Sequence, residues 1–266
     1  LQGNKIHFPI PSVGATENAM LAACACEGTT LIINAAREPE ICDLQDYLNK
    51  TGVDICGAGT AIIRVEGRPK EKGIEHRIIP DRIVAASYIA ALGAAGGKIA
   101  LRGVEPCHID TVVNVMREMG CTIDLHGKEL LVARQGDLSA VRPVCTGPYP
   151  DFPTDAQPPV MAASLLAKGT TVFVENIFEN RYRHVPELLR MGADVRIKDR
   201  VAVVCGVQRL HGAAVESTDL RGGAALIIAA LAAEGTSDIT GLSHVDRGYE
   251  HIETALSKLG ADARRI

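Results

Sequence analysis

Arginines and carboxylates recur where helices are expected to begin, and these are the residues best suited to chemistry. Arg37, Arg181 and Arg247 lie at expected helix starts, although the helix dipole is already positive there. Guanidinium groups and helix N-termini together form binding sites for anions. Asp155 and Asp219 lie at other expected helix starts and could hold or move a proton. The pattern predicts an enzyme or a binder for a small ligand with several negative charges.

A structural explanation exists for each of these positions taken singly. Ser, Thr and Asp at helix starts are ordinary N-caps, because their side chains satisfy free backbone amides. A lone Arg at a helix start is usually solvent-exposed or salt-bridged. The first helices open at Pro11-Ser12-Val13-Gly14, Pro80-Asp81-Arg82, Phe152-Pro153-Thr154-Asp155 and Thr218-Asp219-Leu220-Arg221. From the residues alone, both explanations stay open.

Four related segments, here called modules, must position these side chains. Each module contains an amphipathic helix closed by a glycine, and successive closing glycines are 68, 72 and 68 residues apart. Glycine after such a helix supplies the left-handed cap. Each module reads as helix, strand, helix, strand, strand, which predicts repeated α/β modules with helices buried inside sheets. The glycines are Gly52, Gly120, Gly192 and Gly260, preceded four residues earlier by Leu48, Met116, Leu188 and Leu256.

Composition argues against several functional classes. A formal net charge of −4 argues against a nucleic-acid surface. No run of about 18 apolar residues occurs, so no membrane span is expected, and no signal peptide opens the sequence. No glycine-rich nucleotide loop of the GxGxxG or GxxxxGK[ST] type occurs. The eight cysteines include no CxxC pair. We therefore expect buried free thiols in a cytoplasmic protein, with neither disulfides nor a metal site.

Several short strings of residues are far more specific than these patterns. They are Pro11–Asn18, Ala36–Glu40, Pro80–Ile83, Phe152–Asp155, Phe178–Arg181, His184–Leu188, Asp219–Arg221 and Asp246–Glu250. In order and spacing they resemble the UDP-N-acetylglucosamine 1-carboxyvinyltransferase family, and they span nearly the whole chain.

This resemblance implies a fold and a division into domains. The fold would be an inside-out α/β barrel of repeated helix-strand modules, six in the family, in two domains with the active site between them. Residues 1–79 would be the last module of a first domain that is otherwise missing. Residues 80–266 would form the second domain, with about two and a half to three modules.

The resemblance also implies a reaction. The enolpyruvyl group of phosphoenolpyruvate would move to the 3′-hydroxyl of UDP-N-acetylglucosamine, and phosphate would be released. This reaction would be the first committed step of peptidoglycan synthesis. Addition is followed by elimination through a tetrahedral intermediate, without a metal or an organic cofactor. The expected partners are these two small-molecule substrates.

Individual residues take roles from the same resemblance. Asp155 would be the base that receives the 3′-hydroxyl proton. Arg221 and Arg247 would clamp the carboxylate of phosphoenolpyruvate, a task that suits a planar bidentate donor. Asp219 would lie near the reacting centre, and Arg181 near the substrate phosphates. The other implied substrate contacts are Ser12, Val13 and Gly14 to the nucleotide, Asp81 at the domain junction, Thr154 beside the base, and Ile177.

Part of the family pattern has no counterpart in this sequence. The family's Lys-Asn pair and its mobile loop with a reactive cysteine are missing, and none of the eight cysteines matches that loop. We therefore expect a fragment that is inactive alone and that self-associates through the apolar face left by the missing modules. Two alternatives stay open. One is a shikimate-pathway enolpyruvyl transferase, against which Phe152–Asp155 and Phe178–Arg181 argue; the other is a non-catalytic sugar-nucleotide-binding paralogue.

Overall fold

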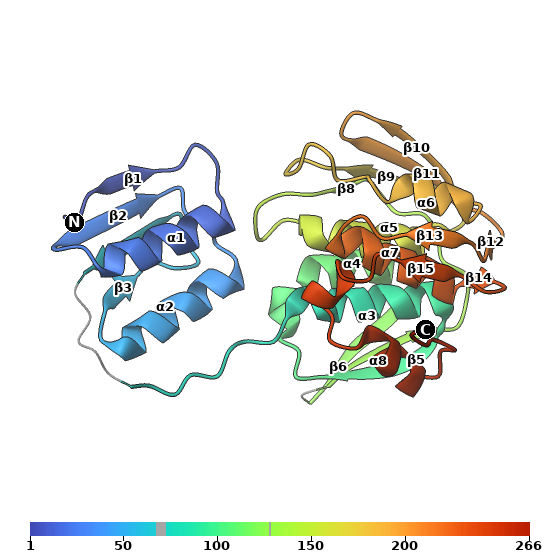
Figure 1. Cartoon of the computed structure of the whole chain (residues 1–266), viewed down its shortest axis with the longest axis horizontal. Coiled ribbons are helices and arrows are strands. Elements are labelled where there is room, and N and C mark those ends of the chain that lie inside the picture. The colour runs from blue at the N-terminus through green and yellow to red at the C-terminus, as the bar shows by residue number, and fades with distance from the viewer. Residues whose placement is uncertain (68–72, 128) are drawn as a thin grey trace. The chain divides into compact units, whose positions relative to one another are not determined.

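The computed structural model describes residues 1–67, 73–127 and 129–266, and the chain folds into two compact units (Figure 1). Unit 1 comprises Leu1–Ile79 with Pro148–Pro150, and unit 2 comprises Pro80–Gly147 with Asp151–Ile266. The first division falls directly before Pro80, a residue type that disfavours helix at the position preceding it. A new helix then begins at Arg82.

Unit 1 is a four-stranded sheet with two helices on one face. The strand order is β1-β2-β4-β3, with β1 parallel to β2 and the other neighbours antiparallel. Strand alternation turns Ile32 and Ile63 inward, where they form one core with Met20 and Ile41 of the helices. The elements are β1 Lys5–His7, α1 Val13–Cys24, β2 Thr29–Ile33, α2 Pro39–Thr51, β3 Asp54–Cys56 and β4 Ile62–Glu66.

In its described ranges, unit 2 contains four sheets: one of four strands, one of three and two of two. The order β8-β9-β11-β10 repeats that of unit 1, with the same parallel and antiparallel pairings, and β5-β7-β6 repeats it without the first strand. Two parallel pairs, β12-β14 and β13-β15, complete the set. None of the sheets closes on itself as a barrel in the described ranges.

The elements of unit 2 follow in chain order. The first group is α3 Arg82–Ala95, β5 Gly97–Arg102, η1 Pro106–His108, α4 Asp110–Glu118, β6 Thr122–His126 and β7 Glu129–Arg134. The second is β8 Val144–Cys145, η2 Thr154–Ala156, α5 Gln157–Ser164, β9 Thr170–Val174, α6 Val185–Arg190, β10 Asp194–Lys198 and β11 Val201–Cys205. The third is β12 Leu210–His211, β13 Ala214–Glu216, α7 Leu220–Leu231, β14 Ala233–Glu234, β15 Asp238–Thr240, η3 Val245–Arg247 and α8 Ile252–Lys258.

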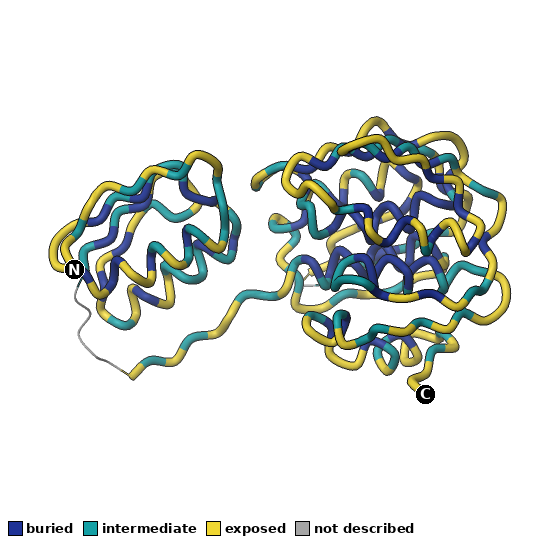
Figure 2. Tube along the Cα trace, turned by 45° about the horizontal axis from the view of Figure 1, so that its top comes forward, coloured by how far each residue is buried: buried dark blue, intermediate teal, exposed yellow. Residues whose placement is uncertain are grey.

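Three helices, α3, α5 and α7, form the centre of unit 2 and are largely buried (Figure 2). Every residue of α5 is buried, and so is most of α3. Their alanine-rich sequences suit this position, because small side chains allow helices to approach closely. The starts of these helices are therefore held rigidly by the core.

The predicted helix ends are confirmed. The four closing glycines have φ values of 100°, 115°, 90° and 99°, and the apolar residue four positions before each one is buried. Ser12, Asp81 and Asp219 are N-caps whose side chains accept hydrogen bonds from backbone amides. The strand expected at Ala261–Asp262 is absent. In the other modules this strand pairs with the strand that follows it, and residues 263–266 of the structure contain no strand.

The expectation that the cysteines are buried is only partly correct. All eight are free, but only Cys24, Cys26 and Cys121 are buried, whereas Cys56, Cys107 and Cys145 are exposed. The exposed ones lie at strand ends and in a short 3-10 helix, where alternation or curvature turns them outward. Within the described ranges, no helix is long and apolar enough to cross a membrane, and no group of three or more His, Cys, Asp or Glu side chains could hold a metal.

Candidate active site

Asp155 is held between two arginines in unit 2. Its Oδ1 accepts a hydrogen bond from Arg181 Nη2 at 2.6 Å, and its Oδ2 accepts one from Arg221 Nη2 at 3.1 Å. Both guanidinium groups are largely buried, whereas the carboxylate is 38% exposed. Asp155 lies inside η2 and makes no capping hydrogen bond. The structural explanation, in which Asp155 caps a helix, is therefore wrong for this residue.

A buried carboxylate, Glu175, binds Thr154, the residue before Asp155, and the loop that follows β9. Glu175 is 1% exposed, and its Oε2 accepts the Thr154 hydroxyl at 3.0 Å. Its Oε1 accepts the backbone amides of Ile177 and Phe178 at 2.9 and 3.0 Å. The loop after β9 is thereby fixed, and it leads directly to Arg181.

Arg181 gains two further contacts from this loop. Its Nη2 also donates to the Thr154 carbonyl at 3.1 Å, and its guanidinium lies 5.2 Å from the centre of the Phe178 ring. Two linked carboxylates thus bring the predicted residues together: Glu175 binds Thr154 and Ile177, and Asp155 binds Arg181.

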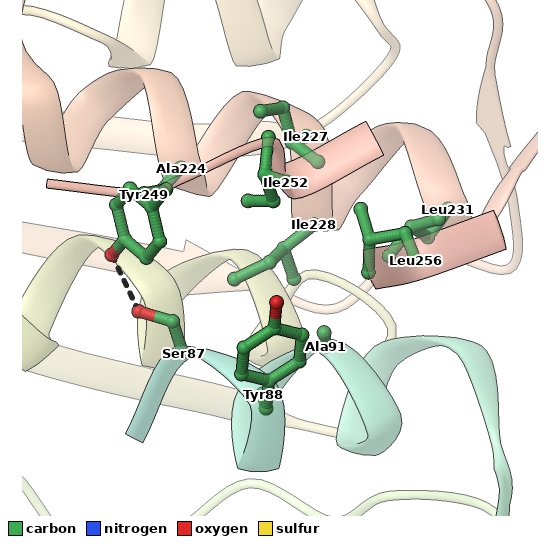
Figure 3. A pocket seen from close by; sticks show the side chains of 10 residues that line it. All are labelled: Ser87, Tyr88, Ala91, Ala224, Ile227, Ile228, Leu231, Tyr249, Ile252 and Leu256. Carbon is green, nitrogen blue, oxygen red and sulfur yellow. Dashed lines mark hydrogen bonds between the residues drawn. The ribbon is translucent and has the colours of Figure 1, made fainter. Parts of the chain in front are cut away.

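Arg221 joins this cluster from the first turn of α7. Its Nη1 donates to the Tyr249 hydroxyl at 3.3 Å, and its guanidinium lies 5.8 Å from the centre of that ring. Burial disfavours the charge of Arg221, but Asp155 and Tyr249 outweigh that effect, so its pKa lies above the usual value. The Tyr249 oxygen lies 2.6 Å from Ser87 Oγ, and the dashed line in Figure 3 marks this hydrogen bond.

His184 is the other unusual group near these arginines. It is 1% exposed, and neither ring nitrogen has a hydrogen-bond partner in the described part of the chain. Its pKa is lowered to about 4, mainly because burial disfavours the charged ring; the charge of Asp219 opposes this effect, the charge of Arg181 adds to it, and the backbone of Arg181 opposes it. A β-carbon on Gly222 would lie 2.9 Å from His184 Cβ, so the β-carbon of His184 packs against the start of α7.

Asp219 and Arg247 are placed differently from Asp155. Asp219 Oδ1 accepts the amides of Arg221 and Gly222 at 3.1 and 2.8 Å, so it caps α7 and holds Arg221 by the backbone. Arg247 is exposed at the end of η3, and no ion pair of its guanidinium is found among the described residues. The structure places it two residues before Tyr249 and outside the ion pairs of Asp155.

The remaining predicted residues are helix starts. In unit 1, Ser12 Oγ accepts the Ala15 amide at 3.4 Å, Val13 opens α1, and a β-carbon on Gly14 would meet nothing within 4 Å. In unit 2, Asp81 Oδ1 accepts the amides of Ile83 and Val84 at 2.8 and 3.0 Å.

Sequence reasoning missed four residues of the site: Glu175, His184, Ser87 and Tyr249. Two signals were present. His184 and Tyr249 lie inside specific strings of the sequence, and Glu175 is a charged residue directly after an apolar strand. Nothing local marks Ser87, which meets Tyr249 across 162 positions.

Comparison with known proteins identifies the class. The fold matches the crystal structure of the enolpyruvyl transferase NikO from Streptomyces tendae, with a TM-score of 0.85 and 27% identity over 95% of this chain and 60% of that one. The mixed α/β fold is thus that of an enolpyruvyl transferase. The chain belongs to the EPSP synthase (3-phosphoshikimate 1-carboxyvinyltransferase) family, whose model matches residues 1–256.

Two curated relatives carry a more specific name. A UDP-N-acetylglucosamine 1-carboxyvinyltransferase 1 of Symbiobacterium thermophilum is 49% identical over 266 residues. A UDP-N-acetylglucosamine 1-carboxyvinyltransferase 2 of Caldanaerobacter subterraneus is 46% identical over 266 residues. The whole chain aligns in both cases, and it spans 60% and 64% of the length of these relatives.

Proposed function

We propose that the chain is part of an enzyme that transfers the enolpyruvyl group of phosphoenolpyruvate to the 3′-hydroxyl of UDP-N-acetylglucosamine, for peptidoglycan synthesis in the cytoplasm. The observation that carries the proposal is Asp155, whose carboxylate is held by Arg181 and Arg221 rather than used as a cap. The names of the relatives at 46–49% identity supply the sugar nucleotide and the transferred carboxyvinyl group, and the family resemblance of the sequence strings supplies phosphoenolpyruvate as its donor.

The proposed chemistry begins at Asp155. Its carboxylate takes the proton of the 3′-hydroxyl as that oxygen bonds to C2 of phosphoenolpyruvate, while C3 gains a proton that comes from water. The tetrahedral intermediate then returns a proton from C3 to water and releases phosphate from C2, which restores the double bond. A carboxylate within hydrogen-bond reach is suited to the first step. The two arginines would hold it in place and stabilise the anionic groups around it.

The arginines divide the anion-binding work in this proposal. Arg221 and Arg247 bind the carboxylate of phosphoenolpyruvate, and Arg181 contacts substrate phosphate. The buried Nε groups of Arg181 and Arg221 have no partner among the described residues. The guanidinium of the exposed Arg247 makes no ion pair in the described ranges and can bind an anion. The other proposed substrate contacts are Ser12, Val13, Gly14, Asp81, Thr154, Ile177 and Asp219.

We also propose that the chain consists of four related modules of an inside-out α/β barrel fold. The identical strand order in the sheets of residues 5–66 and 144–205 supports this, as do the buried helices. Residues 1–79 would then be the last module of one domain and residues 80–266 most of another. The greater length of the relatives supports further modules outside this chain.

Asp155→Asn tests the function in the full-length protein. Asparagine keeps the shape but cannot take the proton, so turnover should fall by roughly 100-fold or more, while calorimetry still detects UDP-N-acetylglucosamine binding. Near-normal turnover of a stable Asn variant would eliminate the base assignment.

Two controls accompany this experiment. Arg247→Lys should weaken phosphoenolpyruvate binding and leave sugar-nucleotide binding largely intact, because a point charge cannot replace a bidentate clamp. Shikimate 3-phosphate offered to the unaltered protein tests the shikimate-pathway alternative. Binding of the sugar nucleotide without any phosphate release would favour the non-catalytic paralogue.

A further inference from the structure

A hydrogen-bond chain of fixed direction runs from Arg221 into the core of unit 2. The Ser87 hydroxyl on α3 lies 2.9 Å from the Ile83 carbonyl and 2.6 Å from the Tyr249 hydroxyl. A carbonyl can only accept, so the single proton of Ser87 goes to Ile83. Tyr249 must then donate to Ser87, and its oxygen is left to accept from Arg221 Nη1 at 3.3 Å.

This chain is shielded from water. Tyr249 is 4% exposed and Ser87 is 5% exposed, and both line the crevice between α3, α7 and the C-terminal segment (Figure 3). A buried hydroxyl that loses its partner has no water to replace it, so the arrangement resists rotation of any one member.

Both Nη groups of Arg221 are therefore tied in place. Nη2 meets Asp155 and Nη1 meets Tyr249, while the ring of Tyr249 lies against the guanidinium. Tyr249 also follows Arg247 by two residues in the segment that packs on α7. The same short segment thus carries one proposed clamp arginine and holds the other.

We infer that Tyr249 is a positioning residue for the reaction: its hydroxyl, anchored through Ser87 on α3, fixes the guanidinium of Arg221 beside Asp155. The inference rests on the proposed function, since Arg221 is taken to bind the carboxylate of phosphoenolpyruvate. Tyr249 itself does not touch the substrate and acts through the orientation of Arg221. Its removal should therefore affect one substrate selectively.

The kinetic test is the variant Tyr249→Phe of the full-length protein. This substitution removes the phenolic oxygen from the chain of hydrogen bonds. The KM for phosphoenolpyruvate should rise about tenfold, the effect of one lost hydrogen bond to a charged group, while the KM for UDP-N-acetylglucosamine stays unchanged. Ser87→Ala should move the same parameter in the same direction by less. Tyr88→Phe is the matched control, because Tyr88 lines the same crevice but takes no part in the chain of hydrogen bonds. This variant should have the same KM values as the unaltered protein.

Two kinetic outcomes would overturn the inference. One is an unchanged KM for phosphoenolpyruvate in Tyr249→Phe. The other is an equal rise for both substrates, or an equal effect of Tyr88→Phe, because general loosening of the crevice would then explain the result. If Tyr249→Phe fails to fold, Ser87→Ala carries the same test.

A second readout does not depend on activity. Nitrogen-15 NMR of the 266-residue chain measures rotation of the Arg221 guanidinium, with the signal assigned by its loss in Arg221→Lys. Rotation should be slow in the unaltered chain, faster in Tyr249→Phe and unchanged in Tyr88→Phe. Equal rotation in all three overturns the inference. Faster rotation in Tyr249→Phe, with no turnover of phosphoenolpyruvate by the full-length protein, upholds the positioning and removes the proposed function instead.

Discussion

Three aspartates at the starts of buried helices of unit 2 have two different roles. Asp81 and Asp219 each use one oxygen to accept two backbone amides, as expected of N-caps. Asp155 is the second residue of its 3-10 turn, after the N-cap position at Pro153, and turns both oxygens to arginines. The residue type is the same, and its position within the turn decides whether the carboxylate caps a helix or binds arginine side chains.

Because His184 is buried, we expect the free energy of unfolding to depend on pH. Its pKa falls from 6.5 to about 4 on folding because burial disfavours the charged ring. Below pH 6.5, His184 binds a proton in the unfolded chain but stays neutral in the folded chain. The free energy of unfolding therefore decreases as the pH falls towards 4. This one group accounts for about 3 kcal/mol over that range. Above pH 6.5 its effect is constant.

The measurement is urea unfolding at pH 7 and pH 4 for the unaltered chain and for His184→Gln. Glutamine cannot titrate, so the difference between the two pH values should shrink by that amount. The carboxylates of the chain contribute equally to the pH dependence of both proteins, so their effect cancels in the comparison. Equal pH dependence in the two proteins would mean that His184 is not neutral and buried in solution.

The sequence predicted the helix ends well and the site only in part. Glycine after a helix and Ser or Asp before one act locally, so Gly52 and Asp219 could be placed from the sequence alone. The link between Tyr249 and Ser87 could not, because it depends on packing between segments 162 positions apart. Most exposed cysteines were also missed, since an apolar neighbourhood in sequence does not say which face of a strand a residue takes.

At the scale of elements, two of the modules carry, directly after their last strand, a glycine that lies against a backbone carbonyl. After β4, a β-carbon on Gly67 would lie 1.8 Å from the Cys26 carbonyl oxygen, and after β11, one on Gly206 would lie 1.6 Å from that of Ala167. Both carbonyls belong to the turn that follows the module's first helix. Only glycine allows the last strand and this turn to approach so closely.

Gly206→Ala should therefore destabilise unit 2 by at least about 2 kcal/mol, because the main chain must shift to admit the methyl group. Gly136→Ala is the matched control: Gly136 follows β7 in the neighbouring module, and a β-carbon there meets nothing within 4 Å. Its effect should be near zero or slightly stabilising through the unfolded state. Thermal unfolding of both variants checks this. A similar loss in the two would contradict the close approach.

At the scale of the whole molecule, the two units have separate hydrophobic cores. One core lies entirely within residues 20–65, and the other two lie within residues 84–263. Cores without shared residues unfold as independent cooperative units. Self-association stays a prediction; sedimentation would test it, and the exposed Leu21 and Ile62 of unit 1 are candidates for the contact.

Calorimetry of the chain should show two transitions. At about 0.7 kcal/mol per residue near 60 °C, unit 1 should absorb about 55 kcal/mol and unit 2 about 130 kcal/mol. Ile32→Ala should lower only the smaller transition and Ile89→Ala only the larger, because each side chain is fully buried in one core. A single transition that moves with either variant would show that the units unfold together.

The buried helices of unit 2 have a consequence for synthesis on the ribosome. Helix α3 ends at Ala95 and its neighbour α7 begins at Leu220, so about 125 residues separate them. At roughly 5–20 residues per second, α3 waits about 6–25 s for α7, the later of the two central helices that pack on it. An apolar helix without a polar face is unfavourable in water for that time. We therefore expect the nascent chain to bury α3 in a provisional collapse, or to bind a chaperone there, until α7 has been synthesised.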